Sequence, residues 1–145
     1  MIALDTNLLV YAHRTDSEFH AESKALVESL ATGSEEWAVP WPCAHEFLAI
    51  VTNPRIFKTP TPLATALAAI RSVHDDSSAT FLAEGEQYLD RLESVAVAAR
   101  VQGGALHDAR VAAICLFHGV RELWSADRDF SRFPTLRVRN PLVGR

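Results

Sequence analysis

Several features that mark other classes of protein are scarce or missing in this chain of 145 residues. It has only two cysteines, Cys43 and Cys115. Both lie in apolar, helix-like contexts, so we interpret them as buried free thiols and not as a disulfide or a catalytic pair. No apolar run approaches the roughly 18–20 residues that cross a bilayer, and Met1 leads straight into a strand-like segment instead of a signal peptide. We therefore expect a cytoplasmic protein that does not associate with membranes.

Motifs for the commonest nucleotide-binding and hydrolytic sites are also missing. The sequence contains neither Gly-x-x-x-x-Gly-Lys nor Gly-x-Gly-x-x-Gly, which excludes the usual phosphate-binding loops. It has no Gly-x-Ser-x-Gly nucleophile elbow. His45-Glu46 does not start a His-Glu-x-x-His zinc motif, because position 49 is alanine. The six histidines are scattered without ligand spacing, so carboxylates are the remaining candidates for a reactive site.

The length and the alternation of patterns predict one α/β domain spanning residues 1–145, with a core that buries roughly two-thirds of the unfolded surface. Short buried or alternating runs predict strands at 2–4, 37–39, 80–82, 122–124 and 136–138, with Pro40 ending the second. Amphipathic spacing predicts helices at 8–13, 18–32, 42–52, 61–73, 84–101 and 108–118, the fifth being closed by Gly103-Gly104. Strands that alternate with helices, without tight hairpin signals, indicate a mostly parallel sheet with helices on both faces.

Single acidic residues stand where the apolar segments begin or end. Asp5 follows the strand-like residues 2–4, Glu46 precedes the apolar run 47–51, and Asp108 precedes the run 109–114; Asp127 and Asp129 follow residues 123–126. An acidic side chain at the edge of a core is costly unless a proton, a cation or a donor compensates it. Each of them alone has an ordinary explanation as a helix cap, a solvated helix residue or a loop acid paired with arginine.

Topology favours a shared role for these acids. In an open parallel sheet, ligands bind outside the carboxyl ends of the strands, where Asp5 and Asp127 are expected. Glu46 and Asp108 lie near helix N-termini, which usually face the same edge and favour an ionised carboxylate. The cheapest partner for several converging carboxylates is a divalent cation. The set therefore predicts a metal-dependent hydrolase.

The net charge of −4 argues at first against a nucleic-acid partner. The chain has 18 acids and 14 bases; setting the five acids named above aside leaves 18 − 5 = 13 acids against 14 bases. The C-terminal stretch is locally basic, with Arg128, Arg132, Arg137, Arg139 and Arg145. An RNA ligand is therefore permitted by the charge but not demanded by it.

Four segments together resemble the PIN domain, and more narrowly the VapC-type toxins of bacterial toxin–antitoxin pairs. They are residues 2–7 (Ile-Ala-Leu-Asp-Thr-Asn), 46–57, 107–109 (His-Asp-Ala) and 125–130 (Ser-Ala-Asp-Arg-Asp-Phe). The likeness covers essentially the whole chain in the family's order. It implies a three-layer α/β/α domain and a magnesium- or manganese-dependent endoribonuclease. It also implies a VapB-like antitoxin that covers the site, and usually a homodimer.

Carried over residue by residue, the resemblance implies an acidic quartet of Asp5, Glu46, Asp108 and Asp127. Asp129 would be an auxiliary acid, and the Thr6 and Ser125 hydroxyls would lie near the site; the family more often has threonine where this chain has Ser125. We expect Asp5 and Asp108 to bind the metal directly and Asp127 to bind it directly or through water. Glu46 would position or deprotonate the attacking water.

Two other functions stay open from the sequence alone. The first is a PIN-fold binding module whose acids are structural. The second is a metal-dependent phosphatase or a phospho-acceptor domain built on Asp5, although Asn7 prevents an Asp-x-Asp signature and Lys24 and Lys58 are the only lysines. The apolar positions of helix 61–73 could serve a partner or the core. The sequence does not fix the RNA target, the antitoxin or the number of metal ions.

Overall fold

A five-stranded parallel sheet forms the centre of the protein. The computed structural model describes residues 1–143, so Arg145 of the basic C-terminal stretch lies outside the described residues. All four neighbouring pairs of strands are parallel, in the order β3-β2-β1-β4-β5. The strands are β1 (Ile2–Leu4), β2 (Trp37–Pro40), β3 (Thr80–Leu82), β4 (Glu122–Trp124) and β5 (Val138–Arg139). The prediction of a mostly parallel sheet is confirmed.

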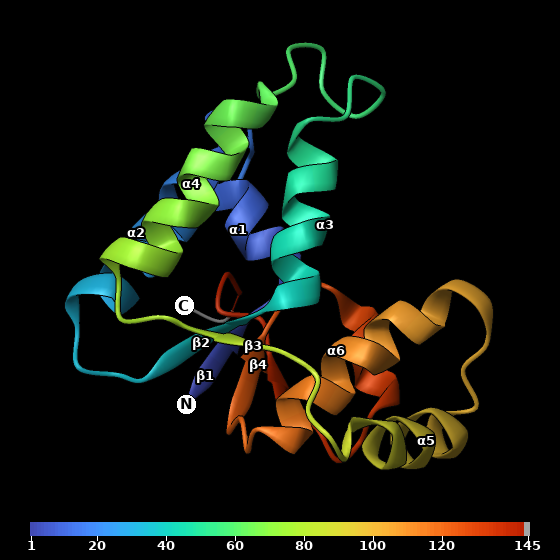
Figure 1. The fold of residues 1–145 in the computed structure, drawn as a ribbon. Helices are drawn as coiled ribbons and strands as arrows, with labels where there is room; N and C mark the ends of the chain where they lie inside the picture. Colours follow the sequence, from blue (N-terminus) through green and yellow to red (C-terminus); the bar gives the residue numbers. More distant parts are fainter. Residues whose placement is uncertain (144–145) are drawn as a thin grey trace.

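Helices cover both faces of this sheet. They are α1 (Thr6–His13), α2 (His20–Thr32), α3 (Trp41–Val51), α4 (Leu63–Asp76), α5 (Tyr88–Ala99) and α6 (Leu106–Phe117), with the 3-10 helices η1 (Gly103–Ala105) and η2 (Arg128–Arg132). The chain moves from β1 to β3 in one direction and then returns across β1 to β4. Right-handed crossovers therefore put α1–α4 on one face and the packed pair α5–α6 on the other (Figure 1). This is the predicted three-layer α/β/α architecture.

The centre of the sheet is buried on both faces, which explains why β1 and β2 are apolar throughout. Ala3, Leu4 and Leu123 have no exposed surface, and the strand-borne Trp37 is 1% exposed. Parallel strands between two helix layers read as continuous apolar runs rather than as alternating ones. Burial of each large apolar side chain contributes about 1.5–3 kcal/mol. The described helices include none that is long and apolar enough to cross a membrane.

The predicted first helix and the predicted second strand are each too short. α1 begins directly after Asp5, at Thr6, because the Asp5 carboxylate accepts the Thr6 N–H and starts the helix. Pro40 lies inside β2 instead of ending it. Its only strand partner is Leu82 of β3, since pairing with β1 stops at Ala38. A missing N–H is tolerated where one side of the strand is unpaired.

The predicted helix 84–101 was too long at both ends. Glu84 pairs with Arg110 of α6, and Gly85 lies against the ring of Phe117, where a Cβ atom would come within 2.6 Å of the ring carbons. The chain therefore enters α5 only at Tyr88. The helix ends at Arg100, which adopts the left-handed conformation with φ 54° and donates its N–H to Ala96 and Val97. The two glycines that were expected to close α5 instead belong to η1 and lead into α6.

The last strand lies two residues later than predicted. Val138 and Arg139 pair with Leu123 and Trp124, whereas Leu136 is a buried loop residue that precedes the strand. Leu136 is an apolar residue of the core, and this made residues 136–138 look like a strand in the sequence. The apolar residues of α4 do not all belong to the core. Ile70 is buried in the core, but Leu63 and Leu67 are 59% and 46% exposed.

Candidate metal centre

Asp5 lies at the carboxyl end of β1, beside the point where the chain order of the strands reverses between β1 and β4. Such a switch point is the usual ligand site of an open parallel sheet. Asp5 is only 5% exposed. Its Oδ1 accepts the Thr6 N–H at 2.8 Å and the Cys43 thiol at 3.5 Å, and its Oδ2 accepts the Ser125 hydroxyl at 2.6 Å. Burial raises the pKa of Asp5 and the Ser125 hydrogen bond lowers it, with burial dominant.

Ser125 links the ends of the two central strands. Besides donating to Asp5, its oxygen accepts the backbone N–H of Asp127 at 2.9 Å. The Asn7 amide donates to both Ser125 and Asp5 at 3.3 Å, and its own oxygen accepts the Ala126 N–H at 3.1 Å. The loop after β4 is therefore fastened to the start of α1. These hydrogen bonds fix the backbone position of Asp127.

Glu46 reaches the same area from α3, on the other side of Asp5. The Thr6 hydroxyl donates to the Glu46 carboxylate at 3.3 Å and also contacts the carbonyl oxygen of Cys43 at 3.5 Å. Partial burial and then the negative charge of Asp5 raise the pKa of Glu46, while the Thr6 hydrogen bond and His107 lower it. The negative charges of Asp5 and Asp127 both raise the pKa of Glu46, so Glu46 interacts electrostatically with the other acids of the site.

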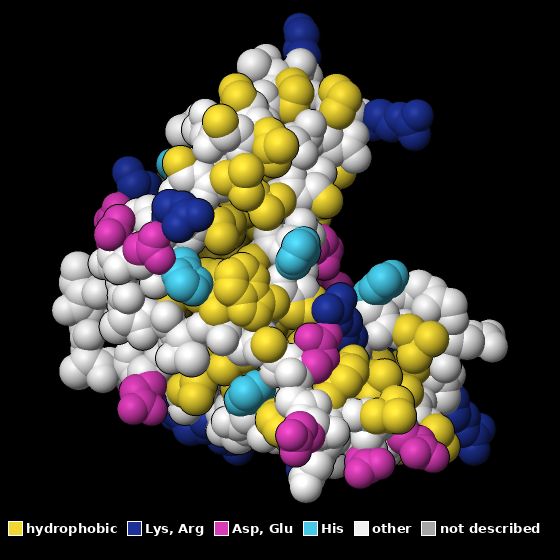
Figure 2. All heavy atoms as spheres, in the orientation of Figure 1, with side chains coloured by type: hydrophobic (Ala, Val, Ile, Leu, Met, Phe, Trp, Pro, Cys, Tyr) yellow, Lys and Arg dark blue, Asp and Glu magenta, His cyan; other side chains and the backbone are white. Residues whose placement is uncertain are grey.

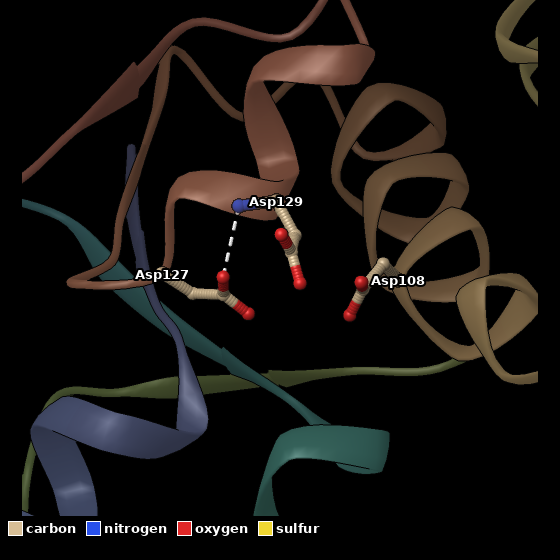
Figure 3. Close-up of side chains that lie close together, drawn as sticks. All are labelled: Asp108, Asp127 and Asp129. Carbon is tan, nitrogen blue, oxygen red and sulfur yellow. Dashed lines mark hydrogen bonds between the residues drawn. The ribbon is translucent and has the colours of Figure 1, made fainter.

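Three carboxylates converge on one point from two elements. Asp108 lies in the first turn of α6, and Asp127 and Asp129 flank the start of η2. Each offers an oxygen within 4.8 Å of the other two, and the three carboxylates point toward a common space (Figure 3). The Asp127 carboxylate also accepts the Asp129 N–H at 2.8 Å, which fixes the turn between them.

Among the described residues, one ion pair, that of Arg132 with Asp129, offsets the negative charge of this group only in part. Burial, and then the negative charges of Asp127, Asp5 and Asp129, together raise the pKa of Asp108 to about 6, while Arg132 lowers it. Arg132 holds Asp129 through its backbone oxygen at 3.0 Å and lies 3.8 Å from its carboxylate. Neighbouring carboxylates repel one another and raise one another's pKa, and a bound cation relieves this repulsion.

The donor set fits a hard divalent cation. Magnesium holds oxygen ligands at about 2.0–2.1 Å, so opposite ligands on one ion lie about 4.2 Å apart. Three ligands of one octahedral ion cannot all be opposite, and adjacent ones lie about 2.9 Å apart, so carboxylate oxygens up to 4.8 Å apart must draw together by roughly 1–2 Å or bind in part through water. The site opens to solvent, because Asp129 is exposed and Asp108 and Asp127 are only partly buried. The surface is hollowed between the upper helices and the α5–α6 pair, and acidic, basic and histidine side chains lie along the hollow (Figure 2).

The structure thus brings together the residues that the sequence singled out, but it groups them differently. Asp108, Asp127 and Asp129 form the ligand-distance group, so Asp129 lies closer to the centre than its auxiliary place implied. Asp5 is not part of this group; it is buried and surrounded by hydrogen-bond donors. Sequence reasoning missed the bridging role of Asn7, although the Asp-Thr-Asn motif contained it. It also missed the contact of Cys43 with Asp5, which no sequence signal indicated.

Comparison with known proteins decides the family. The family model described as "PIN domain" matches residues 2–136. The chain belongs to the PIN-domain family. This confirms the resemblance drawn from the sequence, and it is a different family from the phosphatase and phospho-acceptor domains considered as alternatives.

Curated PIN-domain relatives match along the whole chain. Ribonuclease VapC43 of Mycobacterium tuberculosis is 37% identical over 144 residues, which cover 99% of this chain and 97% of the relative. Ribonuclease VapC48 of the same species is 30% identical and covers 97% of each chain. Among solved structures, VapBC2 from Rickettsia felis bound to a promoter DNA fragment superposes with a TM-score of 0.71 at 16% identity, covering 97% of this chain and 98% of that one. The structural match supports the fold alone, whereas the sequence matches place this PIN domain among the VapC ribonucleases.

Proposed function

We propose that this PIN domain is a metal-dependent endoribonuclease that acts as the toxin of a toxin–antitoxin pair in the cytoplasm. The observation that carries the proposal is the convergence of Asp108, Asp127 and Asp129 within 4.8 Å at the edge of the sheet, near the buried Asp5. Full-length relatives that are named ribonucleases support RNA as the substrate. Hydrolysis of phosphodiester bonds is the reaction for which an acidic centre of this kind is suited.

Magnesium is the proposed cofactor, with manganese as the possible substitute. Asp5, Asp108 and Asp127 are the proposed metal-binding residues, and the geometry adds Asp129 to the candidates. When bound, the ion supplies positive charge that offsets the charge of the phosphodiester and favours deprotonation of water. Carboxylate oxygens are the ligands that both ions prefer.

The protein groups around the ion have separate tasks. Ser125 and Asn7 hold Asp5 and the loop of Asp127 in one fixed relation. Glu46 approaches from the opposite helix and is oriented by the Thr6 hydroxyl. Its raised pKa suits a group that positions the attacking water or accepts its proton, because a stronger base takes a proton more readily.

The decisive test is cleavage of single-stranded RNA with magnesium and with EDTA. Asp5→Asn should lower the cleavage rate by at least about 100-fold, because the amide replaces a central negative charge and turns a donor toward Ser125 and Asn7. Circular dichroism should show an intact fold. Glu93→Gln is the matched control, since it removes an exposed carboxylate on α5. Full activity of Asp5→Asn, or cleavage that persists in EDTA, would contradict the proposal.

The proposed partners are a VapB-like antitoxin and a second copy of this chain. Exposed apolar side chains, Leu63 and Leu67 on α4 and Leu89 and Val97 on α5, offer surfaces for such contacts. Co-expression with the protein encoded by the neighbouring reading frame should give a stable complex whose RNA cleavage is suppressed. Sedimentation of the isolated chain should give the mass of a dimer.

A further inference from the structure

A cavity of about 390 Å³ lies beside the acidic centre, at the carboxyl ends of β4 and β5. Residues 125–128 form part of its wall, and Asp127 is also one of the three converging carboxylates. The cavity and the acidic centre are therefore neighbours across one short segment. The volume falls within the roughly 300–1,000 Å³ of typical small-ligand sites.

The lining combines apolar walls with a few polar groups. Phe133 and Leu136 are buried in the core and present apolar surface to the cavity, together with Val138 of β5. Such a surface suits a flat ring that is removed from water. The packing of Phe133 against Phe130 of η2, with ring centroids 6.1 Å apart, keeps this wall rigid.

Besides Ser125 and Asp127, three further polar residues line the same cavity: Arg128, Ser131 and Asn140. The oxygen of Asn140 accepts the Leu142 N–H at 2.9 Å, which fixes the orientation of the amide. Within residues 1–143 the Nδ2 group of Asn140 has no protein acceptor. It can donate to a bound group, as can the exposed guanidinium of Arg128. Hydrogen-bonding groups around an apolar slot match a nucleobase, which has apolar faces and a polar edge.

We propose that this cavity receives one unpaired nucleobase of the RNA, from a nucleotide next to the cleaved bond, and so sets the sequence preference of cleavage. The inference rests on the proposed ribonuclease function. RNA-binding proteins read single-stranded bases by packing them on aromatic and apolar side chains and bonding their edges. Asp127 belongs both to the wall of the cavity and to the acidic centre. A base in the cavity and a phosphate at the acidic centre can therefore belong to neighbouring nucleotides of one RNA strand.

Direct binding tests the cavity without cleavage. The four nucleoside 5′-monophosphates are titrated into the full-length protein in EDTA, and NMR follows the Asn140 side-chain amide and the backbone amide of Val138, which also lines the cavity and reports on the Asn140 variant. We expect a saturable shift that is strongest for one base. Asn140→Ala should weaken that binding about fivefold, the effect of roughly one hydrogen bond, and Ser131→Trp should abolish it by filling the cavity. Ser29→Trp, an exposed site on α2, is the control for a surface tryptophan.

Cleavage of an RNA library with randomised sequence provides the second readout. Asn140→Ala and Ser131→Trp should lose the preference at one position near the cut, while Ser29→Trp keeps it. No saturable shift with any nucleotide, as expected if the cavity instead holds a partner protein's side chain, overturns the proposal. An unchanged sequence preference in both variants also overturns it. Failure of the wild-type protein to cleave any RNA would reject the ribonuclease function, while nucleotide binding in EDTA would still report on the cavity.

Discussion

The carboxylates of the acidic centre are compensated very unequally. Asp5 is buried but accepts hydrogen bonds from Thr6, Ser125, Asn7 and Cys43. Asp108 is only partly buried, yet the pKa of its carboxyl reaches about 6 because burial and three negative neighbours act together. A hydrogen-bonded carboxylate keeps its charge at modest cost, whereas one that faces other anions destabilises the metal-free fold.

The pH dependence of stability follows from Asp108. Its pKa lies at about 6 in the folded protein against 3.8 for an unperturbed aspartate, so between those values the folded state binds more protons than the unfolded chain. The free energy of unfolding in EDTA should therefore fall as pH rises from about 4 to about 6. After allowance for solvent screening, the Asp108 contribution is on the order of 1 kcal/mol. Urea denaturation at several pH values measures it.

Asp108→Asn should reduce this slope, because the amide does not titrate in that range. Some slope should remain, since the pKa values of Asp5 and Glu46 are raised in the same direction. Equal slopes for wild type and Asp108→Asn would show that the Asp108 carboxyl is not perturbed in solution.

A second prediction at this scale concerns Ser23. Its side chain is fully buried in α2, and its hydroxyl has no hydrogen-bond partner among the described residues. An unsatisfied buried hydroxyl costs about 1–3 kcal/mol. Ser23→Ala should therefore raise the melting temperature. Ser29→Ala, exposed on the same helix, corrects for the higher helix propensity of alanine; a gain no larger than that of the control would mean that the hydroxyl is satisfied.

Among the elements, α1 serves the fold and the centre at once. The carboxylate that caps its first turn is also the buried acid of the site. At its other end, Arg14 stacks on Phe57 with its guanidinium carbon 4.0 Å from the ring centroid and donates to the Thr59 carbonyl at 2.8 Å. It also pairs with Asp16. The loop between α3 and α4 is thereby fastened to α1, which keeps Glu46 and Asp5 in a fixed relation.

Arg14→Lys should destabilise this junction. A lysine keeps the charge but cannot stack, pair with Asp16 and reach Thr59 together. We expect a loss of about 1–2 kcal/mol in unfolding free energy, measured by urea denaturation. Arg121→Lys is the control, because Arg121 pairs with Glu35 on the exposed surface. Equal effects of the two variants would refute the anchoring role of Arg14.

For the whole molecule, metal binding and folding are coupled. An ion that binds only the folded centre stabilises the protein by about 1.4 kcal/mol at ten times its dissociation constant. Magnesium and manganese should each raise the melting temperature in a concentration-dependent way. The rise should vanish in Asp108→Asn and persist in Glu93→Gln. An equal rise with sodium chloride of the same ionic strength would reduce the effect to screening.

Much of this organisation could be predicted from local patterns. Buried apolar runs at residues 2–4 and 37–39 predicted two of the central strands, because a parallel sheet between helix layers leaves a continuous apolar pattern; in the strand at 122–124 only Leu123 is buried. The ends of the elements were harder to predict, because they depend on contacts with distant parts of the chain. Pro40 pairs with Leu82 of β3, and Gly85 lies against the ring of Phe117; the local sequence reveals neither contact. The acids were identifiable because a lone carboxylate beside an apolar segment needs compensation.

The sequence by itself therefore determined the class of fold, the family and the set of acidic residues. Only the tertiary structure decided how these acids are divided. The reversal of strand order brings the loop after β4 beside Asp5, and α6 carries Asp108 in from the opposite face, so Asp129 joins the converging group and Asp5 is enclosed by donors. Distances across a sheet depend on which strands become neighbours, and that choice is made by packing of the whole core rather than by any local pattern.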